Sequence, residues 1–299
     1  MELRVLEYFL AIAQTETISR AAEVLHVTQP TLSRQMAQME RELGVKLFLR
    51  GRKKITLTAE GMLLRSRAEE ILELVDKTET DLIQSETSLA GTVAIGCGDL
   101  AAVQKLPALC RSFHEKYPQV RFDLHTGTAD QIQERLDRGL ADVGLLLEPV
   151  NVAKYAFIRL KQKEQWVAAM RPDSPLARLE AVSPADLKDV PLILPQRLNV
   201  QSELAHWFGD LYPKLNVLFT ANLPSSSSVL VREGLACSLI IRGSIAFWDE
   251  KAVVCRPLRP ALNASCLLAW RRLQPMSRAA EAFVAHAQSY FAEEEGKEP

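Results

Sequence analysis

The sequence has 299 residues, of which 47% are hydrophobic and 24% are charged. These values exclude a disordered or fibrous chain, and the length suggests about two domains at roughly 150 residues each. The net charge of −1 shows no overall preference for nucleic acid, but the charge is unevenly distributed. Residues 1–58 carry nine basic and six acidic side chains, whereas residues 59–89 carry three basic and eight acidic ones.

The sequence predicts three helices in its first 45 residues. Apolar residues at helical spacing between Val5 and Ala13 indicate the first helix. The second is expected to begin at the N-cap Ser19. The third should run over residues 29–43, between the N-cap Thr28 and the C-terminal Gly44. Its predicted buried stripe consists of Leu32, Met36, Met39 and Leu43.

The opposite face of the third helix concentrates short polar groups and one arginine at the helix N-terminus. A recognition helix inserts this end into the major groove, where Gln can bond adenine and Arg can bond guanine or a phosphate. The alternative is an ordinary solvated surface. The residues of this face are Gln29, Pro30, Thr31, Ser33, Arg34 and Ala37.

A short hairpin is expected next, because two runs with alternating apolar residues lie on either side of Gly51. Cations on a turn beside a helix-turn-helix suit phosphate contacts, which add affinity without sequence information. The alternative is a solubilising turn, but helices and basic hairpin in this order favour DNA binding. The basic residues of the turn are Arg50, Arg52, Lys53 and Lys54.

The stretch from Tyr8 to Gly61, YFLAIAQTETISRAAEVLHVTQPTLSRQMAQMERELGVKLFLR followed by ITLTAEG, resembles the DNA-binding head of LysR-type transcriptional regulators. The length near 300 residues also fits this bacterial family. The resemblance implies a winged helix-turn-helix, an α/β body and double-stranded DNA as partner. It assigns base reading to Gln29, Pro30, Ser33 and Arg34, and wing contacts to Arg50, Arg52 and Lys53.

Residues 60–84 predict one long helix, because they lack proline and have their only glycine, Gly61, in the first turn after the cap Thr58. At 1.5 Å per residue this helix spans about 37 Å. Its apolar residues alternate in spacings of four and three, which is a heptad seam. The seam either packs on its own domain or pairs with a second subunit. The resemblance implies a homodimer, a homotetramer of such dimers and a near-palindromic operator. The seam consists of Leu64, Ala68, Ile71, Val75, Thr78 and Leu82.

From residue 85 onward, apolar runs alternate with helical stretches, an order that predicts parallel α/β structure. Strands are expected at 92–96, 120–125, 142–147, 191–194, 216–220, 237–241 and 265–270, and a second unit is expected to start near Gln165. Helices are expected at 100–116, 129–138, 200–208, 226–233 and 277–291.

Two lobes with crossings near 160–163 and 263–266 resemble the periplasmic-binding-protein-like sensor of the same family. Such folds bind ligands in the cleft between the lobes, beyond the carboxyl ends of the strands. The expected partner is a small-molecule metabolite that shifts lobe closure. The expected domains are residues 1–58, a linker helix at 59–88 and an effector domain at 89–299, with lobe I at about 91–161 and 267–299 and lobe II at about 162–266.

Polar residues that follow the strands are the expected effector ligands. Thr128, Arg197 and Ser226 lie at or before helix N-termini, where free N–H groups favour a carboxylate. Asp99 departs from the family, in which many members have a small hydroxyl residue there. It either caps the helix that follows or pairs with an ammonium or another donor of the effector. The expected set is Asp99, Leu100, Thr128, Arg197, Asn199 and Ser226.

The sequence gives no support to catalysis. The five histidines are dispersed without metal-ligand spacing, and GxSxG, GxGxxG and P-loop motifs are absent, so we expect no enzyme, cofactor or metal site. The five scattered cysteines indicate reduced thiols. With no signal peptide and no apolar run of 18 residues, the chain is expected to be cytoplasmic, without a membrane partner. The alternative function is a DNA-binding repressor or architectural protein with a ligand-free or redox-sensing C-terminal domain.

Overall fold

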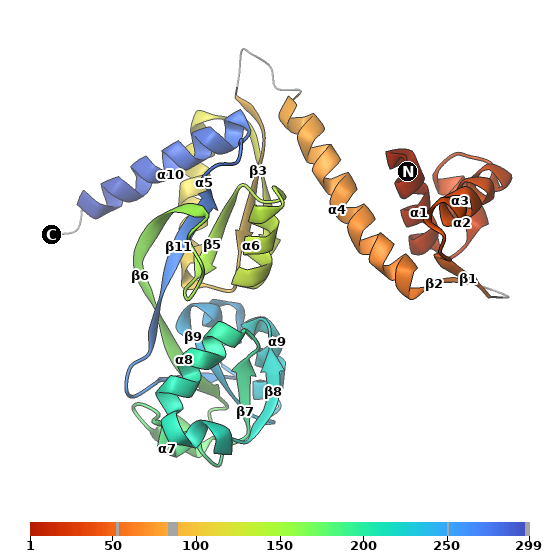
Figure 1. The fold of residues 1–299 in the computed structure, drawn as a ribbon. Helices are drawn as coiled ribbons and strands as arrows, with labels where there is room; N and C mark the ends of the chain where they lie inside the picture. The colour runs from red at the N-terminus through yellow and green to blue at the C-terminus, as the bar shows by residue number, and fades with distance from the viewer. Residues whose placement is uncertain (52–53, 83–88, 250, 297–299) are drawn as a thin grey trace. The chain divides into compact units, whose positions relative to one another are not determined.

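The computed structural model describes residues 1–51, 54–82, 89–249 and 251–296. The chain forms two compact units, Met1–Ile83 and Gln84–Pro299, which are described separately (Figure 1). Within the described residues, no helix is long and apolar enough to cross a bilayer.

The first unit begins with the three predicted helices. Thr17 and not Ser19 caps the second helix, because the Thr17 side chain accepts a hydrogen bond from the Arg20 N–H at 3.4 Å. Thr28 caps the third helix in the same way, and Gly44 ends it at a φ of 69°, both as predicted. The helices are α1 (Leu3–Thr15), α2 (Ile18–Val24) and α3 (Gln29–Leu43).

The core of this unit lies where α3 packs against α1 and α2. Leu32, Met36 and Met39 are buried there, as their spacing predicts. Leu43 is 43% exposed, so its predicted burial is wrong. It is the last residue of α3, and the left-handed Gly44 turns the chain away immediately after it.

The predicted hairpin and long helix complete the first unit. The antiparallel strands β1 (Phe48–Arg50) and β2 (Ile55–Leu57) form the hairpin, and α4 (Ala59–Leu82) follows. The Gly61 N–H donates to the Thr58 hydroxyl at 2.9 Å, which caps α4. A Cβ atom at Gly61 would lie 2.1 Å from the Leu47 carbonyl oxygen, so only glycine allows the helix to approach the hairpin this closely.

The second unit is built on one mixed sheet with the strand order β4-β3-β5-β11-β6-β9-β7-β8, and β10 pairs with β6. Its first part is the predicted parallel βαβαβ arrangement. The strands are β3 (Ala90–Cys97), β4 (Gln119–Thr126), β5 (Val143–Leu147), β6 (Tyr155–Met170), β7 (Leu192–Pro195), β8 (Val217–Ala221), β9 (Cys237–Ile241), β10 (Val254–Pro257) and β11 (Asn263–Arg271).

Strands β6 and β11 run antiparallel through both lobes (Figure 1). The sequence analysis placed the start of a separate unit near Gln165, but Gln165 lies inside the continuous strand β6. The polar residues before it remain extended because they pair with β11. The β6–β11 register shifts between Ser265 and Cys266, beside the predicted crossing.

Lobe I is used below for β3–β5 with their helices, and lobe II for β7–β10 with theirs. Lobe I carries η1 (Ala101–Lys105), α5 (Leu106–Lys116), α6 (Ala129–Asp137) and α10 (Arg278–Gly296). The expected helix at 100–116 thus begins as a 3₁₀ turn. Lobe II carries η2 (Pro175–Arg178), α7 (Pro184–Leu187), α8 (Leu198–Phe208), η3 (Gly209–Lys214), α9 (Pro224–Arg232) and η4 (Arg242–Phe247).

Candidate functional site

The N-terminal half of α3 presents the predicted base-reading residues. Gln29, Pro30, Thr31 and Arg34 are exposed, while Ser33 is half-buried. The hydroxyls of Thr28 and Thr31 lie 2.8 Å apart, so Thr31 also takes part in capping the helix. This helix end is therefore capped and exposed, as the predicted insertion into a DNA groove requires.

The hairpin turn closes through a hydrogen bond from the Gly51 N–H to the Lys54 carbonyl at 2.9 Å. Lys54 forms an ion pair with Glu16. Arg52, Lys53 and the side chain of Arg50 lie outside the described residues. Their predicted phosphate contacts therefore stay predictions.

Glu40 links the hairpin to α3, a contact that the sequence analysis missed. Its carboxylate accepts hydrogen bonds from the N–H groups of Leu47 at 2.9 Å and Phe48 at 3.4 Å, and from Lys46 Nζ at 2.7 Å. Burial of the carboxyl raises its pKa, but these hydrogen bonds outweigh burial and lower the pKa of Glu40 overall. No local motif announces such a bond between a helix and the following strand.

The predicted seam on α4 faces two different environments. Ala68 is fully buried in the core of the first unit, and Leu64 packs against the same core, because α1 covers this side of α4. Ala68 therefore has no surface left for a second subunit, which corrects its assignment. Ile71 is exposed and Val75 is half-buried, while the side chain of Leu82 lies outside the described residues.

A further set of apolar side chains on α4 is exposed to solvent. Leu74 is adjacent to Ile71 and Val75 along this surface and was not predicted. Among the described side chains of α4, the exposed large apolar ones are Met62, Leu63, Ile71 and Leu74.

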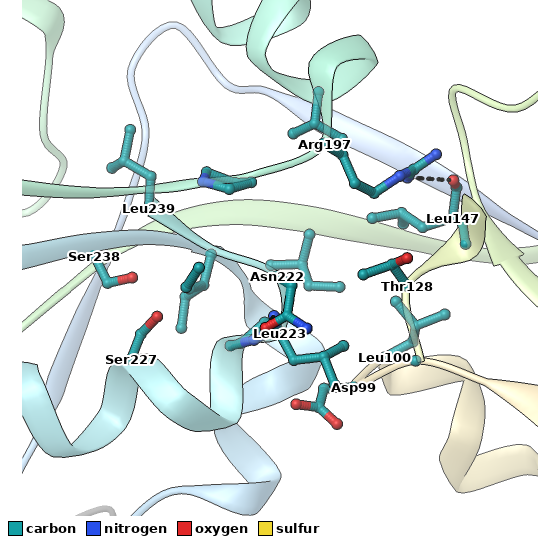
Figure 2. Close-up of a pocket in the computed structure, with 18 of the residues that line it drawn as sticks. Asp99, Leu100, Thr128, Leu147, Arg197, Asn222, Leu223, Ser227, Ser238 and Leu239 are labelled. Atoms are coloured by element: carbon teal, nitrogen blue, oxygen red, sulfur yellow. Dashed lines mark hydrogen bonds between the residues drawn. The ribbon is translucent and has the colours of Figure 1, made fainter. Parts of the chain in front are cut away.

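In the second unit, a cavity of about 80 Å³ lies between the lobes (Figure 2). Asp99, Leu100, Thr128 and Arg197 line it, as expected from their positions after strands and before helices. Apolar side chains dominate the wall, among them Leu100, Leu145, Leu147, Leu194, Val200 and Leu239.

Two predicted effector residues do not reach the cavity. Asn199 is exposed, because α8 already begins at Leu198 and turns Val200 inward. Ser226 is exposed, because α9 begins at Pro224, and it is Ser227 that faces the cavity.

The carboxylate of Asp99, in lobe I, forms a hydrogen bond with lobe II. Its Oδ2 accepts a hydrogen bond from the Ser225 N–H at 3.1 Å, in the first turn of α9. The sequence analysis favoured a cap on the helix after Asp99. That expectation is wrong, because Leu100 is the residue before η1 and no side chain caps this turn.

Arg197 crosses between the lobes in the opposite direction. It precedes α8 in lobe II, and its guanidinium donates to the Leu147 carbonyl at 3.3 Å, the Pro149 carbonyl at 3.1 Å and the Asp130 carboxylate at 2.9 Å. The side chain is 9% exposed, and its buried Nε has no hydrogen-bond partner. The guanidinium of Arg197 is thus already occupied by three acceptors of lobe I.

Thr128 belongs to a complete capping box at the start of α6. Its hydroxyl accepts from the Gln131 N–H at 3.3 Å, and the Gln131 side chain accepts from the Thr128 N–H at 2.9 Å. The predicted anion-binding end of α6 therefore has two of its N–H groups satisfied internally.

The expected effector set lacks four polar residues of the cavity wall. Trp166 is 3% exposed, and its indole Nε1 is buried without a partner. Ser227 and Ser238 are each 1% exposed, and Figure 2 shows their hydroxyls pointing toward one another from α9 and β9. Asn222 lies beside Leu223 at the end of β8. The sequence analysis placed only the start of a second unit near Trp166, because the position of this residue opposite the cleft depends on β6 crossing both lobes.

The thiols show no sign of activation. Burial raises the pKa of Cys110 and Cys255 to about 11 and that of Cys237 to about 12. It also raises the pKa values of Cys97 and Cys266. Since the thiolate is the reactive form, these values disfavour a redox switch. No group of three metal-ligating side chains occurs within the described residues.

Comparison with known proteins identifies both units. Residues 3–62 match the model of the bacterial regulatory helix-turn-helix proteins of the lysR family, and residues 86–292 match the LysR substrate-binding domain. The HTH-type regulator YvbU of Bacillus subtilis is 31% identical over 98% of this chain and 100% of its own length. The Hca operon transcriptional activator HcaR of Escherichia coli is 30% identical over 98% of this chain and 99% of its own.

A solved structure supports the fold. The crystal structure of CbnR, a LysR family transcriptional regulator, matches with a TM-score of 0.74 and 24% identity, covering 97% of this chain and 99% of that chain.

Proposed function

The chain belongs to the LysR family of DNA-binding transcriptional regulators and carries an effector-binding C-terminal domain, and we propose that the cavity between its lobes is the effector site. A small metabolite bound there shifts the closure of the lobes and thereby changes how the helix-turn-helix holds an operator. The ligand can shift this equilibrium only by its difference in affinity for the two lobe arrangements.

One observation carries this proposal. Arg197 and Asp99 each form a hydrogen bond across the cleft, from opposite lobes, and both line the cavity. A molecule that enters the cavity contacts residues of both lobes and changes the environment of both bonds. Occupation of the cavity is therefore coupled to lobe geometry.

The proposal extends to the assembly and the target. Two chains pair through the exposed apolar face of α4, dimers associate into a homotetramer, and the heads bind a near-palindromic operator in the cytoplasm. Support comes from the apolar residues left exposed on this helix. The divisions at residues 1–58, 59–88 and 89–299 belong to the same proposal.

Fluorescence anisotropy tests sequence-specific binding. The full-length protein is titrated onto DNA from upstream of its own gene, and onto random duplex at several salt concentrations. We expect a preference of roughly 10³-fold or more for the upstream DNA. Equal and steeply salt-dependent binding to both would favour the architectural alternative.

A second arm tests the cavity. Ser238→Leu places a larger apolar side chain on β9, beside Ser227 in the cavity wall, and leaves the head unchanged. It should abolish the response of operator binding to metabolites from a cell extract while leaving basal operator affinity intact. A response that survives in this variant would place the effector elsewhere.

A further inference from the structure

The charged groups at the cavity wall are already matched within the protein. The Arg197 guanidinium is paired with Asp130 and two main-chain carbonyls. The Asp99 carboxylate accepts from the Ser225 N–H at the N-terminus of α9, where the helix dipole also favours a negative charge. An anionic ligand would therefore be desolvated in this mainly apolar cavity without gaining a free positive charge, because Arg197 is already paired.

Two hydrogen-bond donors of residues in the same wall, unlike these charged groups, have no partner. Trp166 and Arg197 both line the cavity, and Trp166 Nε1 and Arg197 Nε are buried without a partner among the described residues. Buried polar groups in folded proteins are almost always hydrogen-bonded, so these two N–H groups indicate acceptors supplied from outside the chain. The hydroxyls of Ser227 and Ser238 add polar atoms to a mainly apolar wall.

We propose that the cavity binds an uncharged, mainly apolar molecule whose carbonyl-type oxygens accept hydrogen bonds from Trp166 and Arg197. The inference rests on the proposed effector role of the cavity and names the chemical class of the effector. It replaces the carboxylate that the sequence analysis expected there. The cavity volume of about 80 Å³ holds roughly five to eight water-sized groups, so the molecule is compact.

The test compares three probes with one carbon skeleton: 4-methylpentanoate, 4-methylpentanamide and 5-methylhexan-2-one. They differ only in whether an oxygen anion, an amino group or a methyl group stands beside the carbonyl. Dissociation constants are measured with the full-length protein near neutral pH by ligand-observed NMR. We expect the amide and the ketone to bind at least about tenfold more tightly than the carboxylate, which corresponds to about 1.4 kcal/mol.

Variants locate the binding. Trp166→Phe keeps the aromatic ring and removes the donor, so affinity for the amide and the ketone should fall about tenfold. Trp248→Phe is the matched control, because Trp248 Nε1 is also buried without a partner but lies outside the cavity wall. Arg197→Lys keeps the positive charge and removes Nε, so it should lower affinity for both neutral probes. This variant tests the proposal if Trp166→Phe fails to fold.

The outcomes separate the two proposals. Tightest binding by the carboxylate, or no binding by the amide and the ketone, would overturn the ligand class. If the carboxylate binds most tightly and changes operator affinity, the proposed ligand class is wrong, but the regulatory role of the cavity is supported. A neutral probe could bind to the wild type and lose affinity in Trp166→Phe, yet leave operator affinity unchanged. The proposed ligand class would then be supported, and the proposed regulatory function would be wrong.

Discussion

The guanidinium of Arg197 donates to the carboxylate of Asp130 at 2.9 Å, and the two residues belong to different lobes. The other hydrogen bonds of this guanidinium, to the carbonyls of Leu147 and Pro149, reach the same lobe as Asp130. Opening of the cleft must therefore break three hydrogen bonds of one side chain. The carboxylate of Asp130 compensates the positive charge that Arg197 brings to the cavity wall.

Replacing Asp130 by Asn should move the ligand preference of the cavity toward anions. The variant keeps a hydrogen-bond acceptor beside Arg197 but removes the compensating negative charge. Because the Asp130 side chain is 57% exposed, solvent screens the pair, and its worth is about 1 kcal/mol at most, or about fivefold in affinity. The ratio of dissociation constants for 4-methylpentanoate and 4-methylpentanamide measures this effect.

Glu134→Gln is the control, since Glu134 lies on the same helix and pairs with Arg138. It should leave the ratio unchanged. An unchanged ratio in Asp130→Asn itself would show that Asp130 does not set the charge preference of the cavity.

Arg34→Ala should weaken binding to the operator by about 1–3 kcal/mol, the typical worth of one good base contact. Arg34 is exposed near the N-terminus of α3. Arg41, exposed in the last turn of the same helix, provides the control substitution Arg41→Ala. Anisotropy titrations on operator and random duplex distinguish a lost base contact from a lost phosphate contact. Full operator affinity in Arg34→Ala would contradict its assigned role.

The helices of the head and the parallel strands of lobe I were predictable from sequence because their causes are local. Thr28 and Gly44 mark the ends of α3 by capping alone. The parallel strands of lobe I follow from alternating apolar and helical runs, which depend on residues close together in the chain.

The cavity could be predicted only in part, because its geometry depends on contacts between distant segments. Asp99 bonds to a residue 126 positions away, and Trp166 faces the cleft only because β6 passes through both lobes. Asn199 and Ser226 do not line the cavity, because a shift of one or two residues in a helix start changes which side chain points inward.

The bond between Glu40 and the hairpin predicts a local stability effect in the head. Glu40→Ala leaves the N–H groups of Leu47 and Phe48 without their acceptor, which costs about 1–3 kcal/mol of local stability. Hydrogen exchange at these two amides should accelerate. Glu42→Ala is the control, because exposed Glu42 only accepts a bond from Gln38. Exchange that stays as slow as in the wild type would exclude a role for Glu40 in holding the hairpin.

The same bond predicts a pH dependence. Since the folded-state pKa of Glu40 is lowered, its contribution to stability is fully present above the unfolded pKa of about 4.3. It is lost as the pH falls through the lower folded-state pKa. Protection of the Leu47 amide should therefore fall in acid in the wild type. In Glu40→Gln the protection should be lower near neutral pH and should not show this acid-dependent step.

The cysteines should be inert toward oxidants while the protein is folded. Their raised pKa values leave little thiolate at neutral pH, so labelling with a disulfide reagent such as DTNB should be slow in the native state and fast after denaturation. Operator affinity should be the same before and after mild peroxide treatment. Rapid native-state labelling of one cysteine, together with changed operator binding, would revive the redox-sensing alternative.

The exposed apolar face of α4 should be required for pairing of two chains. Leu74 is 42% exposed and Ile71 is 37% exposed, whereas the deeper residue Ala68 is already buried in the head. Leu74→Glu introduces a charge that a paired interface would have to bury, so we expect monomers in light scattering coupled to size exclusion. Arg65→Glu adds the same carboxylate at an exposed position two and a half helical turns before Leu74, on the opposite side of the helix, and should leave the assembly intact. Because Leu74 lies outside the head core, the head should stay folded in both variants, and an unchanged dimer in Leu74→Glu would place the interface on another surface.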